Sequence, residues 1–149
     1  MQYINGDLIH LSRQGQFDII IHGCNCFNNF GKGLARQIRE VYPKAYEADL
    51  NTRKGDANKL GTYTYAWYPG LMIVNAYTQY RYGRGGVYAD YDAIERVFLQ
   101  LAEDIDITSR IGIPKIGAGL AGGDWSRIET IINKCLDSFN ITCVVYHGP

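Results

Sequence analysis

The sequence predicts an α/β domain in which helices cover both faces of a central sheet. Short β-branched segments alternate along the chain with segments whose apolar residues recur at helical spacing, and this alternation is typical of α/β folds. Two glycine-rich loops lie where predicted strands turn into helices. The chain has the length of one domain, so we expect residues 1–149 to form a single unit.

The first half of the chain contains three predicted strands and two predicted helices. Residues 17–22 form a short apolar, β-branched run, which predicts a buried strand. Residues 33–42 carry apolar side chains at helical spacing, and residues 43–50 begin with a proline that suits the first turn of a further helix. Residues 61–67 and 71–77 are rich in strand formers and are separated by Pro-Gly, so we expect a hairpin or two neighbouring strands.

The second half continues the alternation. Residues 90–103 form the clearest predicted helix, because they carry an apolar stripe and two aspartates near the start, either of which can cap it. Residues 111–114 predict a short buried strand. A further helix begins near residue 124, and residues 141–146 form the last predicted strand.

Composition and charge argue against several classes of protein. Fifteen basic residues balance fifteen acidic residues, which disfavours binding of nucleic acid or membrane through the whole surface. No apolar run approaches the roughly 20 residues of a membrane span, and the N-terminal residues lack the features of a signal peptide. The four cysteines form no C-x-x-C pair. We therefore expect reduced thiols in a cytoplasmic protein, with no metal site and no cofactor.

Two glycine-rich loops are the strongest candidates for a binding site. Residues 23–33 match neither the Walker motif nor the dinucleotide fingerprint, whereas residues 117–123 contain four glycines in seven positions. Loops at this position in α/β folds present backbone N–H groups to anions. A surface turn, or close packing of helix on strand, is the alternative for each loop. The pair predicts a diphosphate held between the two loops.

A third segment, residues 77–88, interleaves tyrosines with two arginines and several glycines. Tyrosine faces suit sugars and bases, and arginine suits phosphate. The same composition resembles a nucleic-acid platform, but the balanced net charge argues against RNA. We interpret the segment as a mobile, aromatic-rich lid.

Three polar residues are candidates for chemistry. His22 ends the predicted strand directly before the first loop, and is either a hydrogen-bonded core residue or a site group. Asp124 precedes a predicted helix and is first of all its cap, so a catalytic role would be additional. Asp7 follows a first strand expected at the N-terminus, ahead of residues 17–22, and is either a turn or capping residue or a member of the site.

Four motifs occur in an order and at separations that resemble the macro domain family. They are Gly-Asp-Leu at residues 6–8, Ile-His-Gly-Cys-Asn at 21–25, Gly-Lys-Gly-Leu-Ala at 31–35, and Ile-Pro-Lys-Ile-Gly-Ala-Gly-Leu at 113–120. The resemblance covers nearly the whole chain. It implies a three-layer α/β/α sandwich with a mixed sheet of about six strands, and ADP-ribose as the ligand class.

The resemblance also implies roles for individual residues. Asp7 matches the carboxylate that accepts from the adenine amino group, and Leu8 contributes its backbone there. Tyr146 lies where family members often stack an aromatic ring on adenine, and Asn25 matches an asparagine that faces the distal ribose. The diphosphate and distal ribose would be held by residues of the two loops: Gly31, Lys32 and Gly33, and Gly117, Ala118, Gly119, Leu120 and Ala121.

Within the family, the chain is most similar to the branch of ADP-ribose 1''-phosphate phosphatases and terminal ADP-ribose glutamate hydrolases. Residues 22–26 resemble the phosphatases. The glutamate hydrolases use a lysine where residues 75–79 read Asn-Ala-Tyr-Thr-Gln, and an aspartate where Ala121 stands. Their lysine-based mechanism therefore does not carry over. The other common hydrolase branch has asparagine at the position of His22.

Three functions remain open from the sequence. The first is a phosphatase acting on ADP-ribose 1''-phosphate, with His22 as general acid or base and Asp124 as the alternative base. The second is an ADP-ribosyl hydrolase acting on protein or nucleic acid, and the third is a non-catalytic ADP-ribose reader. The expected partners are ADP-ribose, its 1''-phosphate or ADP-ribosylated macromolecules. We expect a monomer that does not bind membranes.

Overall fold

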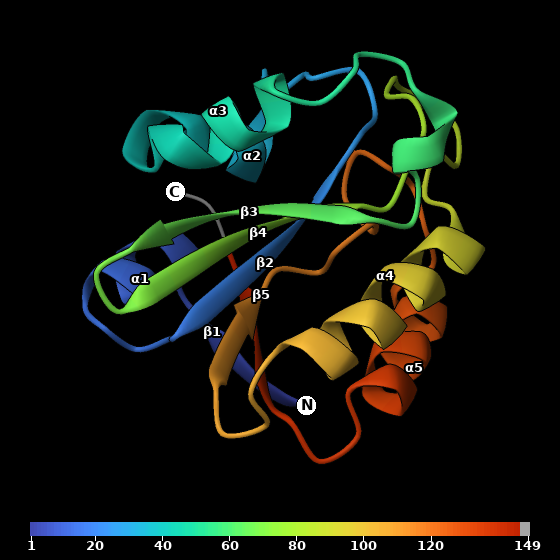
Figure 1. The fold of residues 1–149 in the computed structure, drawn as a ribbon. Helices are drawn as coiled ribbons and strands as arrows, with labels where there is room; N and C mark the ends of the chain where they lie inside the picture. Colours follow the sequence, from blue (N-terminus) through green and yellow to red (C-terminus); the bar gives the residue numbers. More distant parts are fainter. Residues whose placement is uncertain (147–149) are drawn as a thin grey trace.

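A six-stranded mixed sheet forms the centre of the protein (Figure 1). The structure is a computed structural model, which describes residues 1–146. The strands are β1 (Gln2–Asn5), β2 (Ile19–Cys24), β3 (Tyr63–Tyr68), β4 (Leu71–Tyr77), β5 (Arg110–Ile113) and β6 (Asn140–Val145). Their order is β1-β6-β5-β2-β4-β3, and all pairs are parallel except β3 with β4. The carboxyl ends of five strands therefore meet at one edge of the sheet.

Helices form a layer on each face of this sheet. They are α1 (Leu8–Arg13), α2 (Gly33–Val41), α3 (Pro43–Leu50), α4 (Tyr91–Asp104) and α5 (Trp125–Cys135), with a short 3-10 helix, η1 (Ala57–Lys59). Figure 1 shows α2 and α3 on one side of the sheet and α4 and α5 on the other. Helix α1 packs in the same apolar cluster as α2 and α3. This arrangement confirms the three-layer α/β/α sandwich.

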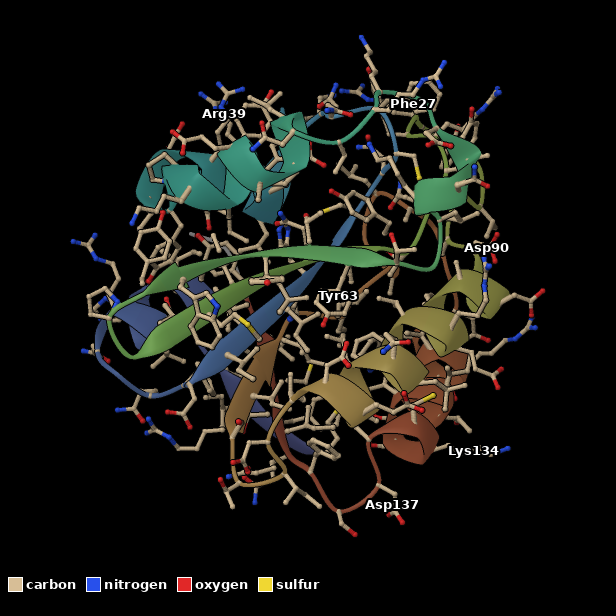
Figure 2. The ribbon with its side chains drawn as sticks, in the orientation of Figure 1. Phe27, Arg39, Tyr63, Asp90, Lys134 and Asp137 are labelled. Atoms are coloured by element: carbon tan, nitrogen blue, oxygen red, sulfur yellow. The ribbon has the colours of Figure 1, made fainter. Side chains whose placement is uncertain are left out.

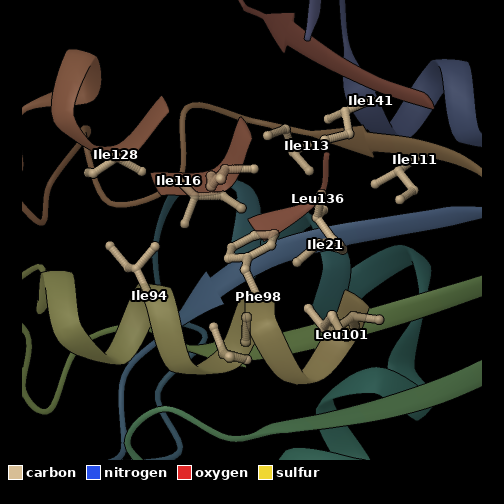
Figure 3. Packing of buried hydrophobic residues seen from close by; sticks show 14 of the residues in the cluster. Ile21, Ile94, Phe98, Leu101, Ile111, Ile113, Ile116, Ile128, Leu136 and Ile141 are labelled. Atoms are coloured by element: carbon tan, nitrogen blue, oxygen red, sulfur yellow. The ribbon is translucent and has the colours of Figure 1, made fainter. Parts of the chain in front are cut away.

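The core consists of two apolar clusters, one on each face of the sheet. Alternate side chains of β2 serve both clusters, because Ile19 and Ile21 face α4 and α5 whereas Ile20 faces the other layer. Figure 3 shows Ile94 and Phe98 of α4 packed in the first cluster. Burial on both faces explains why β2 begins with three consecutive apolar residues, Ile19 to Ile21, instead of alternating apolar and polar ones.

The predicted elements agree with the structure except near their ends. The strand predicted at residues 17–22 runs from Ile19 to Cys24, so His22 lies inside the strand and not at its end. Phe17 instead packs its ring against Gly112, where an added Cβ would lie 2.7 Å from Phe17 Cδ2. The hairpin is confirmed, since Tyr68 pairs with Leu71 across the Pro-Gly turn.

The sequence did not predict α1 as a separate helix. It has only six residues, and its cap is the Asp7 side chain, which accepts a hydrogen bond from the His10 backbone N–H. Figure 2 shows Tyr63 of β3 on the side of the sheet that faces α4, where its hydroxyl donates to Asp104. Within residues 1–146, the helices are too short or too polar to cross a membrane.

Candidate ligand-binding and active site

A cavity of about 630 Å³ opens at the carboxyl edge of the sheet, lined by the ends of β2 and the loops that follow β2, β4 and β5. The helix that follows β2 lies on one face of the sheet, and the helix that follows β5 lies on the opposite face. Ligand sites of α/β sheets form where consecutive connections diverge in this way. The order of the strands and the placement of these two helices therefore determine where the cavity lies.

Most of the predicted site residues line this cavity. They are His22, Asn25, Gly31, Lys32, Gly33, Gly117, Gly119, Leu120 and Ala121. The two glycine loops, which are more than 80 residues apart in the sequence, thus form opposite parts of one site. Ala118 belongs to the second loop but does not contribute to the lining.

Asparagine side chains shape the first loop. Asn25 Oδ1 accepts from the Phe27 N–H at 2.8 Å, and its Nδ2 donates to the Asn29 carbonyl at 3.0 Å. Asn29 Oδ1 accepts from the Gly31 N–H at 2.8 Å. These Asx-type bonds replace regular secondary structure in the loop. Asn25 therefore lines the cavity with both ends of its amide bonded within the loop.

A buried lysine, Lys59, holds the loop of residues 23–33 through two hydrogen bonds. Lys59 Nζ donates to the Cys26 carbonyl at 3.0 Å and to Asn28 Oδ1 at 2.9 Å. Asn28 has a φ of 56°, in the left-handed region that asparagine tolerates better than most residues. Lys59 is buried and its role is to hold the loop, so the cationic character of the cavity comes from other residues.

Unpaired backbone N–H groups line both sides of the cavity. The first three residues of α2, Gly33 to Ala35, have no intrahelical partner for their N–H groups, and Lys32 offers no side-chain cap. In the second loop, the N–H groups of residues 119–121 have no partner among residues 1–146. Both groups of unpaired donors belong to residues that line the same cavity, and unpaired backbone N–H groups of this kind are suited to bind an anion.

Glycine is required in the second loop for conformational and steric reasons. Gly117 has a φ of 76°, and an added Cβ would lie 3.1 Å from Ile128 Cδ1. Its carbonyl accepts from the Gly123 N–H at 2.8 Å, which closes the loop. Gly122 has a φ of 70° and lies against the backbone of Gly86. Close packing explains these glycines, and the resulting turn leaves the N–H groups of residues 119–121 free.

The charged residues of the cavity are all basic. Lys32, Arg84 and Lys115 line it, and among the described residues no aspartate or glutamate does. The chain as a whole has no net charge, so this distribution is local. It makes the cavity attractive for anions.

Lys115 was not expected in the site, whereas Arg84 is one of the two arginines that the sequence suggested as phosphate ligands, and of those two it alone lines the cavity. Lys115 lies in the Pro-Lys-Ile-Gly segment directly before the second loop, and this position could have indicated that it belongs to the site. Arg84 belongs to the segment of residues 77–88. This segment contributes Gln79, Tyr82, Gly83 and Arg84 to one wall of the cavity, and its mobility stays a prediction.

His22 lies at the base of the cavity and is only 2% exposed. Its Nε2 atom lies 2.7 Å from Asn75 Oδ1, and the Phe30 ring packs edge-on at a centroid distance of 5.2 Å. Burial lowers the pKa of His22 to about 4, although the hydrogen bond with Asn75 opposes this shift. The residue is therefore both a hydrogen-bonded core histidine and part of the cavity, with a neutral ring at physiological pH.

Cys24 lies beside His22 on the same face of β2, with Sγ 3.5 Å from His22 Nε2. Burial raises the pKa of the Cys24 thiol well above its usual range, and the Asp49 carboxyl adds to this increase. A protonated thiol is a poor nucleophile. Cys24 therefore acts as a small packing residue in the cavity floor.

The structure places Asp124 outside the cavity lining. Its Oδ1 atom accepts from the Ser126 N–H at 3.0 Å, so it caps α5 as the sequence predicts. Of the two candidate acid–base residues, His22 alone lines the cavity. Within residues 1–146, no group of His, Cys, Asp and Glu side chains is arranged to hold a metal ion.

The residues matched to adenine lie at the same edge of the sheet but outside the cavity lining. Asp7 follows β1 and borders a separate depression of about 450 Å³, while the Leu8 side chain is buried and does not line either cavity. Tyr146 follows β6 and is 61% exposed. Because β1 and β6 are parallel neighbours, both residues leave the sheet on the side where the cavity opens. Their contact with adenine stays a prediction.

This combination of layers, topology and anion cavity defines a class: α/β/α sandwich proteins that bind phosphate-containing ligands at the carboxyl edge of the sheet. No protein-family model matches the chain. It is 36% identical to an uncharacterized 17.5 kDa protein of Enterobacteria phage T4, over 97% of this chain and 95% of that protein. It is 29% identical to an ADP-ribose 1''-phosphate phosphatase of Debaryomyces hansenii, over 90% and 93% of the two chains.

Its structure is also similar to the macrodomain of Thermus aquaticus DarG. The TM-score is 0.73 at 19% identity, and the match covers 99% of this chain and 97% of that one. A macrodomain protein from Streptomyces coelicolor is 28% identical over 99% of both chains, with a TM-score of 0.66. The chain belongs to the macro domain family.

Proposed function

We propose that the protein binds ADP-ribose and hydrolyses ADP-ribose 1''-phosphate to ADP-ribose and inorganic phosphate. The observation that carries this proposal is the cavity, whose lining contains two sets of residues with unpaired N–H groups, three basic residues and, among the described residues, no carboxylate. The similarity to a yeast protein named as this phosphatase supports the choice of substrate.

The diphosphate of ADP-ribose would lie between the start of α2 and residues 119–121. Each set of N–H groups matches one phosphate, and the cations at Lys32, Arg84 and Lys115 offset the charge. A volume of about 630 Å³ falls within the range of small-molecule sites, roughly 300–1,000 Å³. Adenine would then extend toward Asp7 and Tyr146 at the β1 and β6 end of the same edge.

Hydrolysis requires water to attack the terminal phosphorus. A P–O bond forms to the water oxygen, the P–O bond to the ribose 1'' oxygen breaks, and that oxygen takes up a proton from bulk water as it leaves, while the proton that His22 accepts returns to bulk water. His22 would accept the proton from water, because its low pKa keeps the imidazole neutral. Backbone N–H groups and basic side chains would stabilise the charge that develops on the phosphoryl oxygens.

The test is a turnover assay with three substrates: ADP-ribose 1''-phosphate, ADP-ribosylated protein and ADP-ribosylated DNA. We expect phosphate release from the first substrate. Release of ADP-ribose from protein or DNA, with no phosphate release, would favour an ADP-ribosyl hydrolase. Binding of ADP-ribose without turnover of any substrate would identify a reader.

A further inference from the structure

Asn75 lies in the middle of β4, is fully buried, and connects the His22 ring to helix α3. Its Nδ2 group donates to the Ala45 carbonyl at 2.8 Å and to Thr64 Oγ1 at 3.0 Å. A carbonyl oxygen can only accept, so the nitrogen of the Asn75 amide must face Ala45. The amide oxygen must then face His22, and the orientation of this side chain is determined by its neighbours.

The amide orientation determines the protonation of the His22 ring. Because Asn75 Oδ1 can only accept, the 2.7 Å contact requires His22 Nε2 to donate. A neutral imidazole carries one ring proton, so Nδ1 must be the unprotonated nitrogen. Cys24 Sγ, at 3.8 Å from Nδ1, is the neighbouring thiol on the same strand.

A chain of hydrogen bonds, partly buried at Thr64 and buried at Tyr77 and Asp49, continues beyond Asn75. The Tyr77 hydroxyl donates to Asp49 Oδ1 at 2.6 Å, which uses its only proton. Thr64 Oγ1, at 3.0 Å from the Tyr77 oxygen, must therefore donate to it, and remains able to accept from Asn75. All donors in this relay point from His22 toward Asp49.

The relay ends on a carboxylate that is fully buried. Among the described residues, Asp49 Oδ2 has no hydrogen-bond partner, and burial raises the pKa of this carboxyl, whereas Tyr77 and Lys59 oppose that rise. A buried polar chain is costly unless its members are satisfied. Asp49 can only accept from Tyr77, and this determines which atom donates in each bond of the chain. Asn75, Thr64 and Tyr77 therefore each have a defined acceptor.

We propose that Asn75 is a positioning residue that holds His22 as its Nε2–H tautomer, which leaves Nδ1 to accept the proton of the attacking water. Thr64, Tyr77 and Asp49 act through Asn75 by keeping its amide nitrogen bonded on the side away from His22. The role in turnover rests on the proposed phosphatase function. The tautomer is a property of the ligand-free protein and can be measured without any substrate.

The first measurement is the ¹⁵N spectrum of the histidine rings in the uniformly labelled protein of residues 1–149. The signals of His22 are identified by their loss in His22→Gln. We expect a protonated-type shift at Nε2 and an unprotonated-type shift at Nδ1, unchanged between about pH 8 and pH 5 because the ring pKa is about 4. An Nδ1–H tautomer in the wild-type protein would overturn the proposal.

The second measurement compares two variants of similar size. Asn75→Leu removes the acceptor, so we expect mixed tautomers and a fall in kcat that is larger than any change in KM. Asn75→Asp retains an oxygen that can accept from Nε2, so the Nε2–H tautomer and part of the turnover should be retained. Asn75→Leu with the wild-type tautomer would also overturn the proposal.

Several titratable groups near His22 affect how its ¹⁵N shifts and the turnover depend on pH. The His22 ring contacts Asn75, Cys24 and Phe30, and the charged or titratable groups behind the relay are Tyr77, Asp49 and Lys59. Both variants retain these groups, but Asn75→Asp also adds a carboxyl beside His22 that favours the protonated ring, so the two variants are compared near pH 8, where the neutral ring is most favoured. If the wild-type protein lacks phosphatase turnover, the proposed function fails, while the tautomer measurements still decide the role of Asn75.

Discussion

At the scale of single residues, His22 combines burial with access to the cavity. It is neutral because burial outweighs its hydrogen bond to Asn75, and a neutral ring can accept a proton throughout the physiological pH range. Asp124 has a carboxylate but is committed to the start of α5. Both residues lie beside a glycine-rich loop, but His22 alone lines the cavity, and this distinguishes the two candidates for the acid–base role.

We expect His22→Ala to lower phosphatase turnover by about 10²- to 10⁴-fold, the usual contribution of an acid–base group, and to leave ADP-ribose affinity nearly unchanged. Asp124→Ala is the control. It should cost about 1 kcal/mol of stability through loss of the cap and change turnover much less. Steady-state kinetics and calorimetric titration measure the two effects. The opposite ranking would assign the catalytic role to Asp124.

The same histidine should make the fold sensitive to acid. Its pKa falls from 6.5 in the unfolded chain to about 4 in the folded protein, so the unfolded chain binds the proton first as pH falls. Well above pH 6.5 the ring is neutral in both states, so His22 does not lower the free energy of unfolding. Between pH 6.5 and 4 the unfolded chain binds a proton that the folded protein does not, and the free energy of unfolding falls. The loss is up to about 3 kcal/mol, at 1.36 kcal/mol per pKa unit.

Urea unfolding at several pH values between 7 and 4 tests this prediction. The His22→Gln variant has the same remaining carboxylates, so its unfolding free energy should fall less steeply over that range. Parallel curves for the two proteins would show that His22 does not contribute to acid sensitivity.

At the scale of elements, the loop after β5 and the segment before α4 form one continuous wall. The N–H groups of Tyr88 and Ala89 both donate to the Ala121 carbonyl, at 2.7 and 3.2 Å. An added Cβ at Gly122 would lie 2.2 Å from the Gly86 carbonyl oxygen. The position of the free N–H groups at residues 119–121 therefore depends on the contact between these two segments.

Gly122→Ala should destabilise the protein and weaken ADP-ribose binding, because the added methyl group forces the two segments apart. Gly15→Ala is a matched control, since Gly15 also has a positive φ, 76°, but has no atoms within 4 Å of the added Cβ. Both variants should lose about 1–2 kcal/mol through backbone strain. Reduced affinity is expected only for Gly122→Ala, as measured by calorimetric titration, and equal affinities would exclude a role for this contact in binding.

At the scale of the whole molecule, the ligand site connects the two helical layers. The start of α2 belongs to one layer, and the loop that leads into α5 belongs to the other. A ligand bound by both would stabilise the folded sandwich as a unit, since the unfolded chain has no such arrangement.

ADP-ribose should therefore raise the thermal unfolding temperature. With a micromolar Kd, 0.1 mM ligand is about 100 times Kd and adds about 2.7 kcal/mol, which corresponds to roughly 5–10 °C for a chain of this size. Differential scanning fluorimetry measures the shift, with ribose 5-phosphate as the control ligand. No shift at millimolar ADP-ribose would contradict the binding proposal.

Local sequence determined the elements and the two glycine loops. Periodicity distinguishes the run of residues 17–22 from the helix of residues 33–42 because strand and helix repeat their side chains at different intervals. A strand followed by glycines and a helix indicates an anion loop from local residues alone. Local sequence placed the end of this strand too early, because His22 to Cys24 continue it through pairing with residues 75–77, which lie far away in the sequence.

Tertiary structure alone decided which polar residues meet. The sequence contained a signal for Asn75, as a polar residue within the apolar run of residues 71–77, but its partners His22, Ala45 and Thr64 come from three other elements. Capping is local, so the helix-capping role of Asp124 was predictable. Burial and the direction of a hydrogen-bond relay depend on how distant segments pack, and these determined the neutral ring of His22 and its unprotonated nitrogen.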